Sequence, residues 1–187
     1  PVDKSGCKKY LALGDSITQG MLSPLSSITY PCILEREWDV QLLNHGVGGY
    51  LYNANSLDEN LEFDPDIITV AYGANDHYCI ASVDTIEENV DAYYKKLKRL
   101  YENKEIYAIT PIWRGDLDSE EAVQKMRQIR KVITRKAQEY GFGIIDGMKL
   151  VPHIYEAYTD HGLHPNAFGF EEMAKNIKKS IGEARQS

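Results

Sequence analysis

Short apolar runs alternate along the chain with longer segments in which apolar residues recur every three or four positions. The short runs occupy residues 10–13, 40–43, 67–72, 106–110 and 142–145. Their length and composition are typical of strands that are covered on both faces. The pattern therefore predicts five buried β-strands.

The longer segments have the spacing of amphipathic helices. An apolar stripe over residues 86–100 predicts one helix, and we place its start at Asp84 because an acidic residue follows three positions later, as in a capping box. A second stripe over residues 123–140 predicts another helix, with Ser119 before its first turn and Gly141 as its stop. The strands are thus separated by helices.

Two further helices complete the alternation. Thr29, with Pro31 just behind it, opens a helix that carries Ile33, Leu34 and Trp38. The last segment, from residue 166 to about residue 185, is amphipathic as well. Strands that alternate with helices run parallel and are joined by right-handed crossovers, so we expect an α/β fold, a three-layer α/β/α sandwich.

The length of 187 residues suits one domain and is too short for two well-buried ones. We therefore expect residues 1–187 to form a single domain, with residues 1–9 leading into the first strand. The chain opens with Pro1 rather than methionine, which suggests that it was trimmed from a longer protein. The absence of a signal peptide therefore leaves the compartment open.

Unusual loops follow the first four predicted strands: GDSIT at 14–18, NHGVGGY at 44–50, YGANDH at 72–77 and TPIWRGD at 110–116. In an open parallel sheet, ligands bind outside the carboxyl ends of the strands. All four loops begin at that edge of the sheet, so we expect Ser16, a glycine-rich turn and the amide of Asn75 to share one crevice.

This set of residues suits nucleophilic catalysis. A serine hydroxyl needs a base within hydrogen-bond reach and donors that face the developing oxyanion. His164 is the candidate base, because a residue before proline favours an extended backbone that can hold the imidazole over the sheet edge. The backbone N–H groups of Ser16 and Gly49 and the side-chain amide of Asn75 are the candidate oxyanion donors. We expect Asp15 to hold the serine turn through backbone hydrogen bonds.

Charge and composition exclude several other functions. The net charge of −7 argues against a nucleic-acid partner, because non-specific binding requires a basic surface. No apolar run approaches the roughly 20 residues that a transmembrane helix needs. The three cysteines and five histidines lack the spacings of metal sites, so we expect no metal. The GVGGY turn is neither GxGxxG nor a P-loop, which makes a nucleotide site a weak second choice.

The four motifs GDSIT, NHGVGG, GAND and HPN occur in the order that is found in the SGNH, or GDSL-type, hydrolases, and the chain resembles that family over nearly its whole length. Its serine, glycine, asparagine and histidine correspond to Ser16, Gly49, Asn75 and His164. The resemblance implies a flavodoxin-like sheet of order 2-1-3-4-5. It also implies ester hydrolysis through a covalent acyl-enzyme, without a metal or another cofactor.

One position departs from the family pattern. An aspartate usually stands three residues before the histidine, but this chain has His161 there and Asp160 one residue earlier. One interpretation is that the loop bulges, so that Asp160 still reaches the far nitrogen of His164 and completes a triad. The alternative is that a backbone carbonyl orients His164 and leaves a Ser-His dyad. We favour Asp160.

The substrate is predicted from the residues around the crevice. Trp113, Arg114, Tyr78 and His161 are candidate substrate contacts, although the aromatic residues also suit ordinary packing. A polar, tyrosine-rich rim favours short-chain deacylation of a carbohydrate or a similar small ester. The alternatives are a lysophospholipase or thioesterase acting on longer acyl chains, and a non-catalytic binding module with the same fold. The sequence leaves the oligomeric state open.

Overall fold

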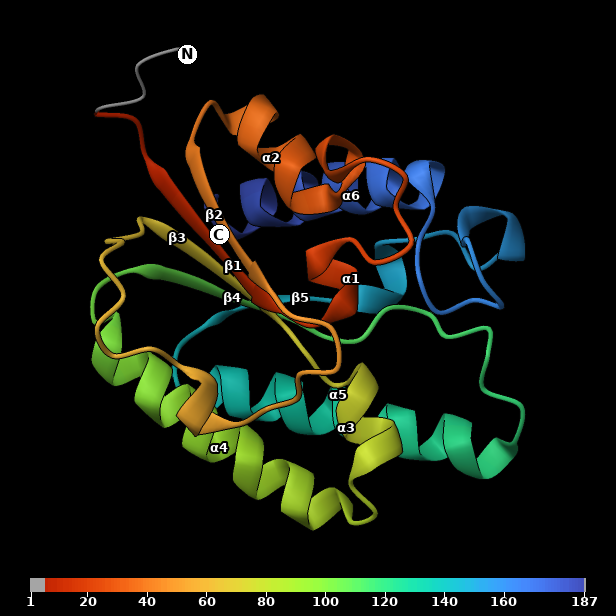
Figure 1. Cartoon of the computed structure of the whole chain (residues 1–187). Coiled ribbons are helices and arrows are strands. Elements are labelled where there is room, and N and C mark those ends of the chain that lie inside the picture. Colours follow the sequence, from red (N-terminus) through yellow and green to blue (C-terminus); the bar gives the residue numbers. More distant parts are fainter. Residues whose placement is uncertain (1–5, 187) are drawn as a thin grey trace.

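The chain forms a parallel five-stranded sheet in the order β2-β1-β3-β4-β5, seen in the computed structural model of residues 6–186 (Figure 1). The strands are β1 (Lys9–Gly14), β2 (Gln41–Gly46), β3 (Ile67–Ala71), β4 (Glu105–Ile109) and β5 (Gly143–Ile145). This order and direction confirm the predicted fold class. Of the expected leader 1–9, residues 1–5 lie outside the described residues.

The expectation of five buried strands is wrong for the two edges of the sheet. β2 has one exposed and five partly exposed residues, and β5 has only one buried residue. Each edge strand has a neighbour on one side alone, so part of its surface stays open to solvent. The apolar runs in the sequence locate these strands but do not show that they lie at the edges.

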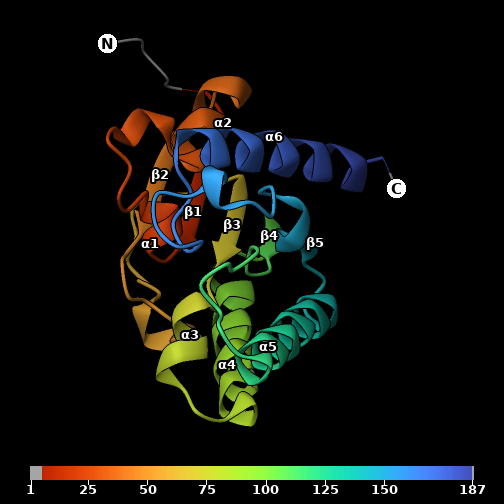
Figure 2. The same cartoon turned by 90° about the vertical axis from the view of Figure 1, so that its right-hand side faces the viewer.

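Helices cover both faces of the sheet, and side chains of β1 alternate between them. Tyr10 and Ala12 pack in one core cluster, with α2 (Tyr30–Trp38) and α6 (Ala167–Ala184). Leu11 and Leu13 pack in the other, with α4 (Val83–Leu100) and α5 (Glu120–Glu139). Figure 2 shows these two helical layers on opposite sides of the strands. The predicted three-layer sandwich is therefore present.

The ends of α5 agree with the sequence, whereas the start of α4 differs. Ser119 caps α5, where its hydroxyl accepts a hydrogen bond from the N–H of Ala122 at 3.1 Å. Gly141, with a φ of 71°, directly follows Tyr140, the C-cap residue of the same helix. The helix expected to start at Asp84 instead has Ser82 as its cap residue, without a side-chain hydrogen bond. Asp84 lies inside the first turn, where its charge favours the helix dipole.

Shorter helices occupy the connections between the long elements. α1 (Ser16–Gln19) follows β1, and α3 (Ala74–Cys79) follows β3. Single 3₁₀ turns form η1 (Ser26–Ile28), η2 (Ala54–Ser56), η3 (Gly147–Lys149) and η4 (Tyr155–Ala157). None of the helices in the described part of the chain is long and apolar enough to cross a membrane. α1 and α3 both begin at the carboxyl edge of the sheet, where the crevice was predicted.

Two glycines at the strand ends allow α1 to lie close to the sheet. A Cβ atom on Gly46, the last residue of β2, would lie 2.3 Å from the backbone nitrogen of Gln19. A Cβ atom on Gly14, at the end of β1, would lie 2.0 Å from Oγ1 of Thr18 in α1 and 2.8 Å from the carbonyl oxygen of Ala71 in β3. At each position a backbone atom lies less than 3.0 Å from the added Cβ, so only glycine fits. This close approach fixes Ser16 against the ends of the central strands.

Candidate active site

Ser16 is the first residue of α1 and lies directly beyond the carboxyl end of β1. Asp15 caps this helix, because its carboxylate accepts a hydrogen bond from the N–H of Ile17 at 3.0 Å. Gly20 ends the helix after one turn in the left-handed conformation, with a φ of 86°. The hydroxyl of Ser16 is thus carried on a short, capped turn, and Asp15 makes the backbone contact that the sequence predicted.

The side chains of Ser16, His164 and Asp160 lie in one hydrogen-bonded line. The Oγ of Ser16 is 3.0 Å from Nε2 of His164. On the other side of the imidazole, Nδ1 of His164 is 2.6 Å from Oδ2 of Asp160. A carboxylate at Nδ1 fixes the tautomer that leaves Nε2 free to accept the serine proton. Groups in this geometry can serve as a nucleophile, a base and an orienting acid.

The loop between Asp160 and His164 shows how the shifted aspartate reaches the histidine. Its Oδ1 accepts hydrogen bonds from the backbone N–H groups of His164, at 2.7 Å, and Leu163, at 3.2 Å. Gly162 has a φ of 89°, a conformation that glycine adopts without strain, and it turns the chain back between these residues. The extra residue is therefore absorbed in a tight loop, and the carboxylate faces the imidazole.

Electrostatics keep Asp160 ionised. Partial burial disfavours the charged carboxylate, but the hydrogen bonds from the side chain and the backbone N–H of His164 outweigh it. The pKa of Asp160 therefore lies below its ordinary value. A charged Asp160 stabilises the imidazolium that forms when His164 takes up a proton.

The loop after β2 places a free backbone donor beside the serine. A Cβ atom built on Gly48 would lie 3.8 Å from the Cβ of Ser16. The next residue, Gly49, has a φ of 82°, and its N–H has no hydrogen-bond acceptor within residues 6–186. The side-chain amide of Asn75 donates to the carbonyl of Tyr50 at 2.8 Å, which ties the start of α3 to the same loop. The glycine loop thus lies beside Ser16 and is tied to Asn75.

Asn44, the first residue of the glycine motif, joins the ends of β2 and α1. Its Nδ2 donates to the carbonyl of Thr18 at 2.9 Å, and its Oδ1 accepts from the N–H of Gly46 at 3.0 Å. The side-chain amide of Gln19 holds the next turn, because its Oε1 accepts from the N–H of Gly48 at 2.8 Å. These bonds fix the glycine loop relative to the serine turn.

The family model that describes the GDSL-like lipase/acylhydrolase family matches residues 12–171 of the chain. The chain belongs to the GDSL-like lipase/acylhydrolase family. The matched segment runs from β1 into α6 and includes Ser16, Gly49, Asn75, Asp160 and His164. Membership confirms the resemblance that the four motifs indicated, and it makes the chain a member of a family of esterases and acylhydrolases.

Solved structures share this fold, and one relative is similar in sequence over part of its length. The structure of the esterase EstA from Pseudoalteromonas sp., inhibited by monoethylphosphonate, superposes with a TM-score of 0.80 at 17% identity and covers 96% of this chain and 100% of that one. A two-domain esterase active on acetylated mannans gives a TM-score of 0.76 at 18% identity, covering 96% of this chain and 50% of that one. An uncharacterized protein of Methanocaldococcus jannaschii is 28% identical over 89 residues, which span 46% of this chain and half of the relative.

Arg114, a candidate substrate contact, is buried in this GDSL-like protein rather than free in the crevice. Its side chain is only 1% exposed and forms an ion pair with Asp116, with an N–O distance of 2.6 Å. Its Nη2 also donates to the hydroxyl of Tyr78 at 2.6 Å, and the guanidinium lies 5.0 Å from the centre of the Tyr78 ring. Tyr78 itself is 57% exposed. Arg114 thus fixes an exposed tyrosine beside Asn75, on the same short helix.

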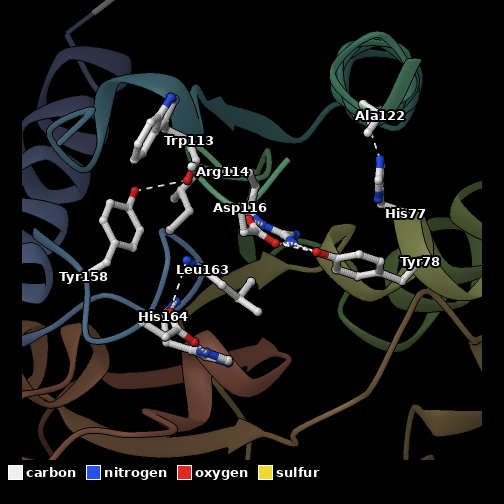
Figure 3. Close-up of polar contacts among 12 residues, drawn as sticks. His77, Tyr78, Trp113, Arg114, Asp116, Ala122, Tyr158, Leu163 and His164 are labelled. Atoms are coloured by element: carbon white, nitrogen blue, oxygen red, sulfur yellow. Dashed lines mark hydrogen bonds and ion pairs between the residues drawn. The ribbon is translucent and has the colours of Figure 1, made fainter. Parts of the chain in front are cut away.

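Trp113 and His161 occupy different surroundings. Trp113 packs against three aromatic rings and stacks on that of His153, with 5.6 Å between centroids. Its carbonyl accepts a hydrogen bond from the hydroxyl of Tyr158 at 3.0 Å (Figure 3). This is packing, the alternative that the sequence left open for the aromatic residues. His161 is exposed in the loop beside Asp160.

Two residues near the site were not predicted. Asp116 anchors both Arg114 and Tyr78, although in the sequence it is only the last residue of the TPIWRGD loop. Figure 3 shows Leu163 pointing from the histidine loop toward the side on which Asp116 and Tyr78 lie. A carboxylate two residues after an arginine was the available signal for Asp116, whereas nothing in the sequence marks Leu163.

Two buried carboxylates lie beneath the serine turn. Burial, with a smaller contribution from the nearby Asp76, raises the pKa of Asp15 to about 7, although the hydrogen bond from the N–H of Ile17 and the charge of Arg114 oppose the shift. Burial likewise raises the pKa of Asp76 to about 6, although its Oδ1 accepts a hydrogen bond from the N–H of Tyr52 at 3.1 Å. Within residues 6–186, no group of three or more His, Cys, Asp or Glu side chains is arranged to hold a metal ion.

Replacing Asp15 with Asn should remove a pH dependence of stability. Between pH 4 and pH 7 the unfolded chain loses the Asp15 proton while the folded chain, whose Asp15 pKa is about 7, keeps it. The free energy of unfolding of the wild type should therefore fall as the pH rises, relative to Asp15→Asn, by up to about 3 kcal/mol. Asn retains an oxygen for the N–H of Ile17. Denaturant titrations of both proteins across this range measure the difference, and a constant difference would contradict the raised pKa.

Proposed function

We propose that the chain is a serine ester hydrolase that works through an acyl-enzyme. Ser16 is the nucleophile, His164 the general base and Asp160 the residue that orients His164. The observation that carries this proposal is the 3.0 Å contact between Ser16 Oγ and His164 Nε2, together with the 2.6 Å contact between His164 Nδ1 and Asp160. Membership of the GDSL-like family supports the same chemistry.

The reaction proceeds in two halves. Ser16 Oγ attacks the ester carbonyl while Nε2 of His164 takes up the hydroxyl proton. The tetrahedral intermediate then releases the alcohol, whose oxygen receives that proton from His164, and the acyl group stays on Ser16. In the second half a water molecule gives a proton to His164 and attacks the acyl carbon. Ser16 regains the proton, and the carboxylic acid leaves.

The negative charge on the carbonyl oxygen needs donors that are in place before the reaction. The N–H of Gly49 is unpaired within the described chain, and Ser16 is the first residue of its helix, where an N–H has no acceptor one turn earlier. The second N–H of the Asn75 amide completes the set, because the first is held by Tyr50. These three groups are the proposed oxyanion hole.

A short acyl group on a carbohydrate or a similar small alcohol is the proposed substrate. The cavity lined by Asp15 and Ile17 has a volume of about 20 Å³, which suits a water molecule rather than an acyl chain. The ion pair of Arg114 with Asp116 holds the side chain of Tyr78 in place near Asn75. The fold is shared with an esterase active on acetylated mannans, which is consistent with this class.

A lysophospholipase or thioesterase remains the second candidate, because one loop near the serine is apolar. Met21, Leu22 and Leu25 follow α1 and are 41%, 52% and 61% exposed. Such side chains can hold a longer acyl chain along the surface. A non-catalytic binding module is disfavoured by the hydrogen bond from His164 to Asp160, since the shifted aspartate was the main argument for it.

Replacement of Asp160 with Ala should lower kcat for ester hydrolysis about 10² to 10⁴-fold, because His164 then loses the group that fixes its tautomer. Asp118→Ala is the matched control, since Asp118 is exposed. Thermal melts of both variants show whether the loop that Asp160 supports remains folded. A kcat near that of the wild type in folded Asp160→Ala would favour the Ser-His dyad.

A series of p-nitrophenyl esters separates the two substrate classes. Hydrolysis should be fastest with acetate and fall by an order of magnitude or more as the acyl chain lengthens to decanoate, because the cavity beside Asp15 and Ile17, at about 20 Å³, is too small for a long chain. The ratio of kcat to KM for each ester is the quantity to compare. A steady rise from acetate to decanoate would favour the lysophospholipase or thioesterase.

A further inference from the structure

A surface groove begins at the proposed oxyanion donor Gly49. It has a volume of about 350 Å³, within the range of small-molecule sites, and is lined by Gly49, Tyr50, Leu51, Asn53, Asn55 and Ser56. A Cβ atom on Gly49 would meet no other atom within 4 Å, so the space beside the Cα of this residue is open. The neighbouring Gly48 approaches Ser16, as described above. A molecule in this groove therefore has one end beside the nucleophile.

No charged side chain lines the groove, and its lining combines apolar surface with amide and hydroxyl groups. Asn53 and Asn55 are exposed, and the side-chain amide of Asn55 has no hydrogen-bond partner within residues 6–186. The side chain of Asn53 accepts a hydrogen bond from the N–H of Asn55 at 3.0 Å, which leaves its NH₂ group free to donate. Tyr50 adds an aromatic ring in a residue that is 42% exposed. Amides beside a ring suit a neutral ligand with several hydroxyl groups better than a phosphate or an ammonium ion.

Hydrogen bonds to α3 and α4 fix the backbone that forms the groove. The carbonyl of Tyr50 accepts from Asn75, and the N–H of Tyr52 donates to Asp76 at 3.1 Å. At the far end, Nζ of Lys96 donates to the carbonyl of Leu57 at 3.0 Å. Both α3 and α4 thus anchor the segment. A site that is formed before its ligand arrives binds at a lower cost in ordering.

We propose that this groove binds the alcohol part of the substrate, a sugar ring whose acylated hydroxyl lies over Ser16. The ring packs on Tyr50, and its other hydroxyls exchange hydrogen bonds with the amides of Asn53 and Asn55. After acyl transfer the sugar leaves this groove with the proton that His164 returns to its oxygen. This assignment rests on the proposed ester hydrolysis and adds the chemical class of the leaving group.

The test compares two acetyl esters, one with a sugar and one without. An O-acetylated methyl glycoside uses the groove, whereas p-nitrophenyl acetate brings the same acyl group without hydroxyls. In Asn55→Ala the KM for the glycoside should rise about tenfold relative to the KM for p-nitrophenyl acetate, with kcat little changed. Tyr50→Leu keeps the backbone bonds of Tyr50 and should shift the same ratio in the same direction.

Asn60→Ala is the matched control, because Asn60 is an exposed asparagine outside the groove. It should leave the KM ratio at the wild-type value. If the protein hydrolyses both esters and Asn55→Ala and Tyr50→Leu also keep the wild-type ratio, the groove is not the sugar site while the proposed function stands. If the wild type hydrolyses neither ester, the proposed function fails and this assignment fails with it.

Discussion

The hydrogen bond between Ser16 and His164 joins residues that are 148 positions apart, and the remaining features of the site are arranged around it. Ser16 lies on a turn that packs closely against the sheet. This close packing is possible because β1 and β2 both end in glycine. His164 is held by Asp160, which closes its own loop through two backbone N–H groups. The parallel sheet brings the serine turn and the histidine loop to the same edge.

Much of the fold could be predicted from the sequence, because the apolar periodicity of each strand and helix is a local property. The strand order is not a local property, because it depends on which strands pair. Here it was predicted from the family resemblance. Two local details were wrong for physical reasons. β2 lies at an edge and is partly exposed, and α4 begins at Val83, after the cap residue Ser82 whose side chain makes no capping hydrogen bond, rather than at Asp84.

The candidate site was predictable as a set of residues but not as a set of contacts. Asp160 was favoured from its distance along the chain, and the structure shows the loop, with Gly162 at a positive φ, through which it reaches His164. Arg114 was expected to face the substrate, yet it is buried against Asp116. The burial of Arg114 depends on packing between elements that are distant in the sequence. The residue pattern of its own loop therefore does not predict that burial.

Covalent labelling of Ser16 tests the central claim most directly. A fluorophosphonate reacts with a serine only where a base activates the hydroxyl and donors stabilise the developing charge. Mass spectrometry of the labelled protein should place the adduct on Ser16, and His164→Ala should abolish it while leaving the fold intact. A folded wild-type protein that takes up no label, or labelling of Ser16 that persists in His164→Ala, would contradict the account.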